Sequence, residues 1–137
     1  MCYNYVQASG GIMSKVKIKS TLQNLTSNEV YSTDTIGIKI DDKIKFKDNE
    51  INVVICVNEE SVMIERKCKE YHLTLHVSQN NMTKGTYNIY NLGIIDLDIT
   101  TNKLIINENK IETNYILDFR NNEKTEFEFL IELEELE

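Results

Sequence analysis

The chain has 137 residues, of which 41% are hydrophobic, and a formal net charge of −7. A chain of this length fits one domain with a hydrophobic core of its own. The acidic balance argues against nucleic-acid or anionic-membrane binding, because both depend on surplus lysine and arginine. No apolar run approaches the roughly 20 residues that a membrane-spanning helix requires.

The first twelve residues differ from the rest, because apolar and polar side chains begin to alternate only at Met13. We expect 1–12 to be a disordered leader and 13–137 to be the single domain. The codons GGA GGA ATT could encode residues 10–12, which would form a purine-rich ribosome-binding sequence before a start codon at Met13. The leader is then not native. No secretory signal pattern is visible, and the sequence is rich in Asn, Lys and Ile, so we expect a bacterial, cytoplasmic protein.

Period-two alternation predicts a series of short strands from residue 15 onward. The expected strands cover 15–22, 29–40, 43–47, 51–57, 62–66, 71–77, 87–89, 95–99 and 104–106. In the second of them, Ile36, Ile38 and Ile40 share one face, which we expect to be buried. Gly37 in the same strand is expected to mark a bend or a bulge.

The clearest alternation lies between Lys110 and Glu135, where two amphipathic runs flank a polar turn at 121–125. This pattern predicts a β-hairpin with one buried face. Ile116 and Leu130 interrupt its polar face, and we expect them to lie opposite each other. An isolated hairpin cannot bury such a face, so the earlier strands must cover it.

About ten short strands with turns every eight to twelve residues are typical of sandwiches and barrels. No segment has the apolar spacing that requires a helix. The chain has no proline to protect strand edges, and closure removes those edges. We therefore predict an all-β fold, a closed antiparallel β-barrel of about 8–10 strands. Residues 1–69 carry a net charge of +1 and 70–137 one of −8, so we expect first-strand lysines beside last-strand glutamates.

Arg66 is the most informative polar residue, because its parity points it toward the apolar interior. A charge placed there requires a partner or an opening. Asp34 could supply the carboxylate, or Arg66 could stand at the barrel mouth and receive an anionic ligand. Tyr71, Tyr87 and Tyr115 also occupy apolar-face positions, where they could line a cavity or fill it. These five residues are the candidate ligand-binding set.

The sequence offers little support for catalysis or metal binding. His72 and His76 lie four residues apart in one strand, a span of about 13 Å, which is too long for two ligands of one ion. No nucleophile motif or phosphate-binding glycine loop is present, and we expect the acidic pair Asp96 and Asp98 to face solvent. We therefore assign no catalytic residue, metal or cofactor, and we favour a protein that is not an enzyme.

The order of several features resembles a known family. They are Gly37, the arginine-bearing Met63-Ile64-Glu65-Arg66, Gly85-Thr86-Tyr87, Leu92-Gly93-Ile94-Ile95-Asp96-Leu97 closing on Thr101, and the final acidic hairpin. From about Glu29 to Glu134 this order resembles the YwiB-like family, uncharacterised small bacterial proteins with a calycin-like, lipocalin-related β-barrel. The chain departs from the family pattern at Cys68, where glycine is usual, and at Ile36 and Ile38, where tyrosines are common. The resemblance implies a calycin-like barrel and no established activity.

Two hypotheses of function follow, with a third less supported. The leading one is a non-catalytic module that binds a small apolar or amphipathic molecule in the barrel mouth, with Arg66 as polar anchor; a pocket of about 300 Å³ or more would favour it. The alternative is a structural or protein-interaction module with a filled core. It would form a homodimer through an exposed patch around Val54, Cys56, Ile116 or Leu130. A hydrolase or isomerase would require two titratable groups in one cleft with opposed pKa shifts.

Overall fold

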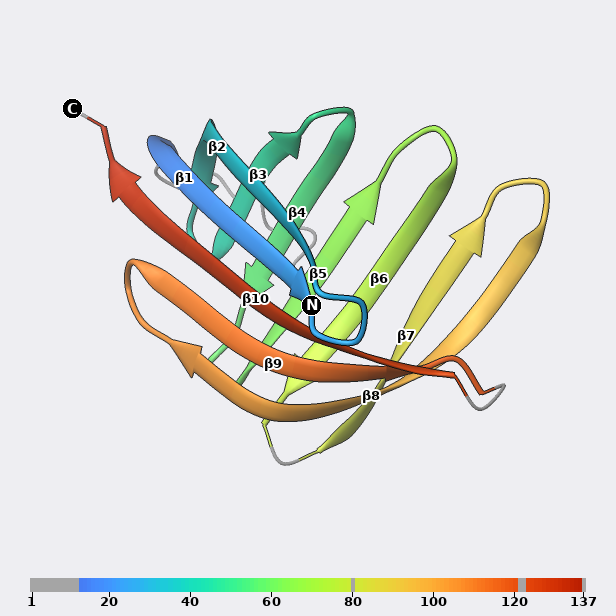
Figure 1. Cartoon of the computed structure of the whole chain (residues 1–137). Coiled ribbons are helices and arrows are strands. Elements are labelled where there is room, and N and C mark those ends of the chain that lie inside the picture. The colour runs from blue at the N-terminus through green and yellow to red at the C-terminus, as the bar shows by residue number, and fades with distance from the viewer. Residues whose placement is uncertain (1–12, 80, 121–122, 137) are drawn as a thin grey trace.

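The computed structural model describes residues 13–79, 81–120 and 123–136, which contain ten β-strands and no helix. The strands are β1 (Met13–Asn24), β2 (Glu29–Ile40), β3 (Lys43–Asp48), β4 (Ile51–Val57), β5 (Ser61–Lys67), β6 (Tyr71–Ser78), β7 (Met82–Ile89), β8 (Gly93–Ile106), β9 (Lys110–Asp118) and β10 (Lys124–Glu135). All are antiparallel neighbours in one closed barrel, in the order β1-β10-β9-β8-β7-β6-β5-β4-β3-β2 (Figure 1). The predicted closed antiparallel barrel is confirmed. The expectation for residues 1–12 lies outside the described residues.

Pairing between the first and last strands closes the barrel, as predicted. β1 runs antiparallel to β10, with Lys17 opposite Glu134 and Lys19 opposite Glu132. The lysines of the first strand therefore lie beside the glutamates of the last strand. Because these side chains are exposed, each pairing contributes only about 0–1 kcal/mol. In the part of the chain that the structure covers, no helix is long and apolar enough to cross a membrane.

The predicted hairpin of β9 and β10 is present, but the predicted register is wrong. Ile116 lies opposite Glu126, and Leu130 lies opposite Glu112. The turn comes two residues earlier in the chain than the predicted 121–125, since Lys124 already pairs with Asp118 and the Phe119 N–H donates to the Glu123 carbonyl oxygen at 3.2 Å. The resulting shift of four residues is even, so it leaves every side chain on its predicted face. Period-two patterning identified the faces of the hairpin and left its register open.

The orientation of β2 is also the reverse of the prediction. Ile36 and Ile38 point outward and are 61% and 36% exposed, whereas Gly37 is buried. A Cβ atom on Gly37 would lie 2.5 Å from Ile18 Cδ1 and 2.5 Å from the Lys45 carbonyl oxygen. Glycine is therefore the residue that lets β2 approach its neighbours, and this contact decides which face of β2 is inside. The ladder with β1 continues through Gly37 without a bulge.

A bulge does occur in β8. This strand contains both of the expected strands 95–99 and 104–106. Its pairing with β9 shifts between Thr101 and Lys103, so Asn102 is the additional residue. The bulge changes the inward parity, since Thr101 is buried and Leu104 packs against the core on the same side. This change of parity made 95–99 and 104–106 read as separate strands.

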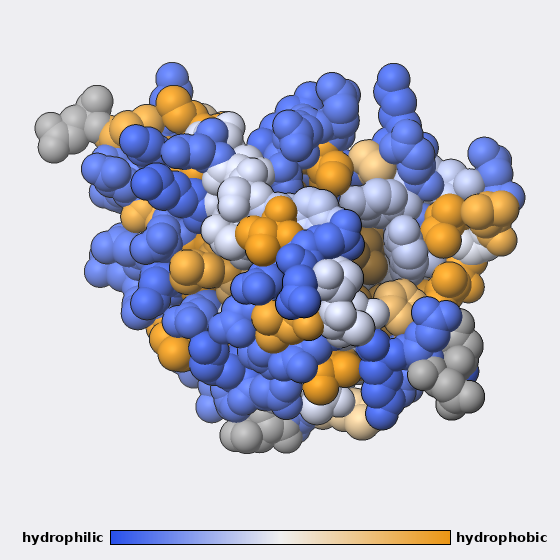
Figure 2. Space-filling model, in the orientation of Figure 1, coloured by the Kyte–Doolittle hydropathy of each residue, from blue (hydrophilic) through white to orange (hydrophobic). Residues whose placement is uncertain are grey.

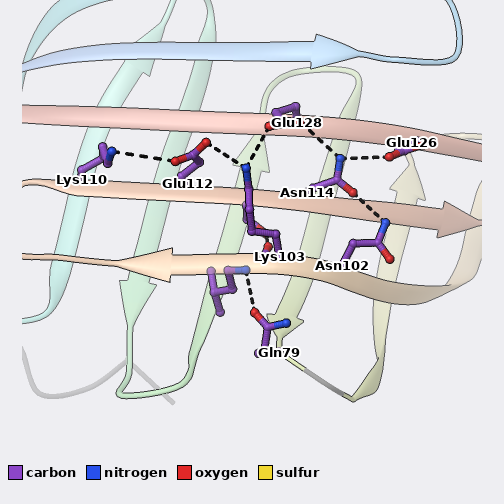
Figure 3. Close-up of polar contacts among 10 residues, drawn as sticks. Gln79, Asn102, Lys103, Lys110, Glu112, Asn114, Glu126 and Glu128 are labelled. Carbon is purple, nitrogen blue, oxygen red and sulfur yellow. Dashed lines mark hydrogen bonds and ion pairs between the residues drawn. The ribbon is translucent and has the colours of Figure 1, made fainter.

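Polar side chains on the outer surface link β8, β9 and β10 at this bulge (Figure 3). Asn102 Nδ2 donates to Asn114 Oδ1 at 2.7 Å. Lys103 Nζ lies 3.0 Å from Glu112 Oε2 and 3.3 Å from Glu128 Oε1. The glutamates raise the pKa of Lys103, mainly through these hydrogen bonds. This network of hydrogen bonds supports the bulge on the solvent side of the barrel.

The two ends of the barrel differ in packing. We call the end with the β1–β2, β3–β4, β5–β6, β7–β8 and β9–β10 turns the mouth, and the opposite end the packed end. Fully buried aliphatic side chains fill the middle and the packed end, and they include Val16, Ile18, Ile44, Ile55, Val62, Leu75, Val77, Leu97, Ile99 and Ile131.

On the face seen in Figure 2, most of the surface is hydrophilic and hydrophobic residues are scattered in small groups.

Candidate functional site: a cavity at the barrel mouth

A cavity of about 520 Å³ occupies the mouth of the barrel. Four of the five residues in the candidate ligand-binding set line it: Arg66, Tyr71, Tyr87 and Tyr115. Asp34 does not, because the reversed orientation of β2 leaves it exposed on the outer surface. The expectation that Asp34 pairs with Arg66 is therefore wrong. The inward position of Arg66 itself was predicted from its parity.

The partner of Arg66 is Asp48, the last residue of β3. Arg66 Nη2 lies 3.0 Å from Asp48 Oδ2, and the two side chains are 14% and 13% exposed. The Thr33 hydroxyl of β2 donates to the other carboxylate oxygen, Asp48 Oδ1. Asp48 lies just beyond the expected strand 43–47. It shares the parity of Ile44 and Phe46, and that signal could have identified it.

This polar group joins three strands where the barrel wall is least continuous. β2 pairs with β3 only from Ile38 to Ile40, so the two strands have no ladder nearer the mouth. Thr33, Asp48 and Arg66 come from β2, β3 and β5 and connect them through side chains. The wall of the cavity therefore depends at this point on a hydrogen-bonded carboxylate as well as on backbone pairing.

Arg66 has more hydrogen-bond donors than the protein engages. Among the residues that the structure describes, Asp48 is the single acceptor for its guanidinium group. An arginine side chain has several further N–H groups in the same plane. A largely buried polar group without a partner costs free energy. These N–H groups can therefore bind an acceptor supplied from the cavity.

Tyr115 presents a second polar group without a protein partner. Its side chain is 4% exposed and lines the cavity, and its ring stacks on Phe127 with a centroid distance of 5.7 Å. Over the described ranges of the chain, its hydroxyl forms no hydrogen bond with another residue. Burial raises the pKa of Tyr115, and the nearby charge of Arg66 opposes this effect only in part. The hydroxyl therefore remains protonated at neutral pH.

Tyr71 and Tyr87 line the cavity from the neighbouring strands β6 and β7. Their rings meet edge to face, with a centroid distance of 5.6 Å and an interplanar angle of 79°. Burial is the main cause that raises the pKa of Tyr87, followed by the charge of Tyr71. Leu73 and Phe129 complete the apolar part of the lining. Aromatic rings thus surround a space instead of filling it.

Titratable groups elsewhere lie on the outside of the barrel. His72 Nε2 is 2.8 Å from Glu65 Oε2. Asp98 accepts hydrogen bonds from Arg120 Nη2 at 3.0 Å and Lys84 Nζ at 2.5 Å, which lower the pKa of its carboxyl group to about 2. Within the described part of the chain, no three His, Cys, Asp or Glu residues gather in a metal-binding group.

Comparison with known proteins identifies the fold. The crystal structure of the YwiB protein from Bacillus subtilis superposes with a TM-score of 0.69 at 15% sequence identity, covering 96% of this chain and 99% of that chain. The chain has the YwiB fold. The resemblance inferred from the sequence is thereby confirmed for the fold. No family model matches the sequence, and no curated protein matches it. Within the YwiB fold of this chain, the cavity described above is the site that could hold a ligand.

Proposed function

We propose that the protein is a non-catalytic module that binds a small, partly apolar molecule in the mouth of its barrel. The observation that carries this proposal is the mouth cavity itself, in which Arg66 and Tyr115 present hydrogen-bond donors that none of the residues described by the structure accepts. Apolar walls with a few convergent polar groups are typical of small-molecule sites.

The size of the cavity supports binding over a filled core. Small-molecule pockets commonly measure about 300–1,000 Å³, and the mouth cavity has about 520 Å³. Its aromatic side chains also present large rigid surfaces, because ring pairs at Tyr71–Tyr87 and Tyr115–Phe127 hold each other in place. A ligand would therefore meet a largely preformed site.

The alternative of a homodimer receives less support from the surface. Of the four residues expected to form its exposed patch, Cys56 is 8% exposed, and Val54, Ile116 and Leu130 are partly buried. An interaction module needs a continuous exposed apolar area, and these residues do not provide one.

Titration with N-phenyl-1-naphthylamine, an uncharged dye that fluoresces in apolar sites, tests the proposal. We expect saturable binding to the wild-type protein. Leu73→Trp should weaken it about tenfold or more by filling the cavity, since each tenfold change requires only about 1.4 kcal/mol. Leu73 lines the cavity, whereas its neighbour Thr74 points to the other face of β6. Thr74→Trp is thus a matched control and should leave the affinity unchanged.

Two results would contradict the proposal. One is an absence of saturable dye binding to the folded wild-type protein. The other is equal affinity of the Leu73→Trp and Thr74→Trp variants, which would place the dye outside the cavity. As a separate measurement, native mass spectrometry of the protein from its own host would identify a retained ligand directly and report the number of subunits.

A further inference from the structure

We infer that the mouth cavity selects an uncharged molecule, an aromatic body bearing a hydrogen-bond acceptor such as a carbonyl group, and that Asp48 causes the rejection of carboxylates. This inference rests on the proposed binding function and specifies its ligand. Arginine in an apolar pocket would ordinarily suggest an anionic ligand. Here the charge of Arg66 is already balanced by Asp48 at 3.0 Å.

The charge of the cavity lining is neutral as a whole. Arg66 and Asp48 are the charged side chains among the residues that line it, and the others are apolar, aromatic, amide or hydroxyl groups. An anion beside Arg66 would therefore also lie close to the Asp48 carboxylate in a site largely removed from water. Like charges at such a distance repel strongly in a low-dielectric environment. The net charge of −7 adds to this repulsion.

Asp48 is held where it is and cannot easily turn away to admit an anion. The Thr33 hydroxyl donates to Oδ1, and Arg66 donates to Oδ2. Both carboxylate oxygens are thus engaged, one by β2 and the other by β5. A ligand that displaced Asp48 from Arg66 would leave a largely buried carboxylate without its counter-charge, which is costly.

The hydrogen-bonding groups match a neutral acceptor. Arg66 has N–H groups beyond the one bonded to Asp48, and Tyr115 has a protonated hydroxyl that bonds to none of the described residues. Each of them can donate to a carbonyl oxygen held in the cavity. The stacked and edge-to-face ring pairs can enclose a flat aromatic body. A carbonyl oxygen satisfies these donors and adds no charge beside Asp48.

The test compares two isosteric competitors, 2-acetylnaphthalene and 2-naphthoate, which differ by a methyl group in place of a charged oxygen. Each displaces N-phenyl-1-naphthylamine from the wild-type protein at neutral pH. We expect the ketone to bind about tenfold or more tightly than the carboxylate. Asp48→Asn keeps the shape of the side chain and removes its charge, so it should reverse this preference.

Asp34→Asn is the matched control, because it makes the same change of charge at an exposed position on the outer surface. It should leave the preference for the ketone intact. Equal affinities of the two competitors for the wild-type protein, or tighter binding of naphthoate, would overturn the inference while the proposed function stands. An Asp48→Asn protein that folds, binds the dye and still prefers the ketone would also overturn it. Failure of the dye and both competitors to bind would instead contradict the proposed function.

Discussion

The packed end and the mouth of the barrel are built from the same ten strands by different chemistry. At the packed end the inward positions hold aliphatic side chains with almost no exposure, such as Val62, Val77 and Ile131. At the mouth the same strands turn inward Arg66 and Tyr115, around a cavity of about 520 Å³. Close packing maximises burial and dispersion. The mouth cavity reduces both the buried area and the dispersion contacts, and it leaves room for a ligand.

The comparison indicates which end supplies stability and which end can bind. Ten strands enclose a wider interior than eight, and about eight is the number at which side chains alone fill a barrel. Side chains fill the interior at the packed end and leave it partly open at the mouth. Stability should therefore depend mainly on the packed end, and substitutions at the mouth should alter binding more than folding.

The largest effect is expected from a matched pair of leucine truncations. Leu97 is fully buried and does not line the mouth cavity, and Leu97→Ala should destabilise the protein by about 2–5 kcal/mol through lost burial and a new cavity. Leu73 borders the existing mouth cavity, so Leu73→Ala should cost about 1 kcal/mol, since it enlarges a space already present. Urea unfolding followed by circular dichroism measures both. Equal losses would remove the proposed difference between the packed core and the cavity wall.

A second contrast uses glycine positions. Gly37→Ala would place a Cβ atom 2.5 Å from the Lys45 carbonyl oxygen, part of the backbone, so it should cost about 3 kcal/mol through overpacking. Gly93, at the mouth, has no neighbour within 4 Å of such an atom and a φ of +125°. Gly93→Ala should cost about 1 kcal/mol, from backbone strain alone. A harmless Gly37→Ala substitution would show that β2 does not approach β3 as closely as described.

The smallest effect concerns an ion-pair cluster outside the mouth. Arg120, next to the β9–β10 turn, and Lys84 lower the pKa of Asp98 from 3.8 to about 2. The folded-state pKa lies below the unfolded value, so the contribution of Asp98 is present above about pH 4 and is lost as the pH falls toward 2. NMR titration should give a pKa near 2, returning toward 3.8 in Arg120→Gln. Amide exchange at low pH should increase first in the β9–β10 turn. A pKa that stays near 2 in the variant would exclude Arg120 as the main cause.

Several features of the fold and the site could be read directly from residue spacing. Alternation predicted nearly all the strands, the antiparallel closure and the final hairpin. Parity alone turned Arg66, Tyr71, Tyr87 and Tyr115 inward, and the structure places all four around one cavity. These predictions succeed because side chains in a strand point alternately to its two faces, so a local pattern reports the face of each residue.

The errors share a cause that lies outside any single strand. The alternation predicted that Ile36 and Ile38 are buried. Close contact between Gly37 and β3 instead turns them outward, and with them Asp34. The hairpin register depended on where the turn between β9 and β10 lies along the chain. The bulge at Asn102 changed the parity of β8 partway along its length. Each of these is a contact between strands that no pattern within one strand encodes.

The all-β barrel and the pairing of its lysine-bearing first strand with its glutamate-bearing last strand follow from the amino-acid sequence, because hydrophobic alternation and charge pattern are local properties of the chain. Parity could have turned Asp48 inward, but its pairing with Arg66, and the cavity that the tyrosines leave open, appear only when the strands are assembled. Those outcomes depend on distances between residues of different strands. Such distances are set by how closely neighbouring strands approach and by where their pairing ends.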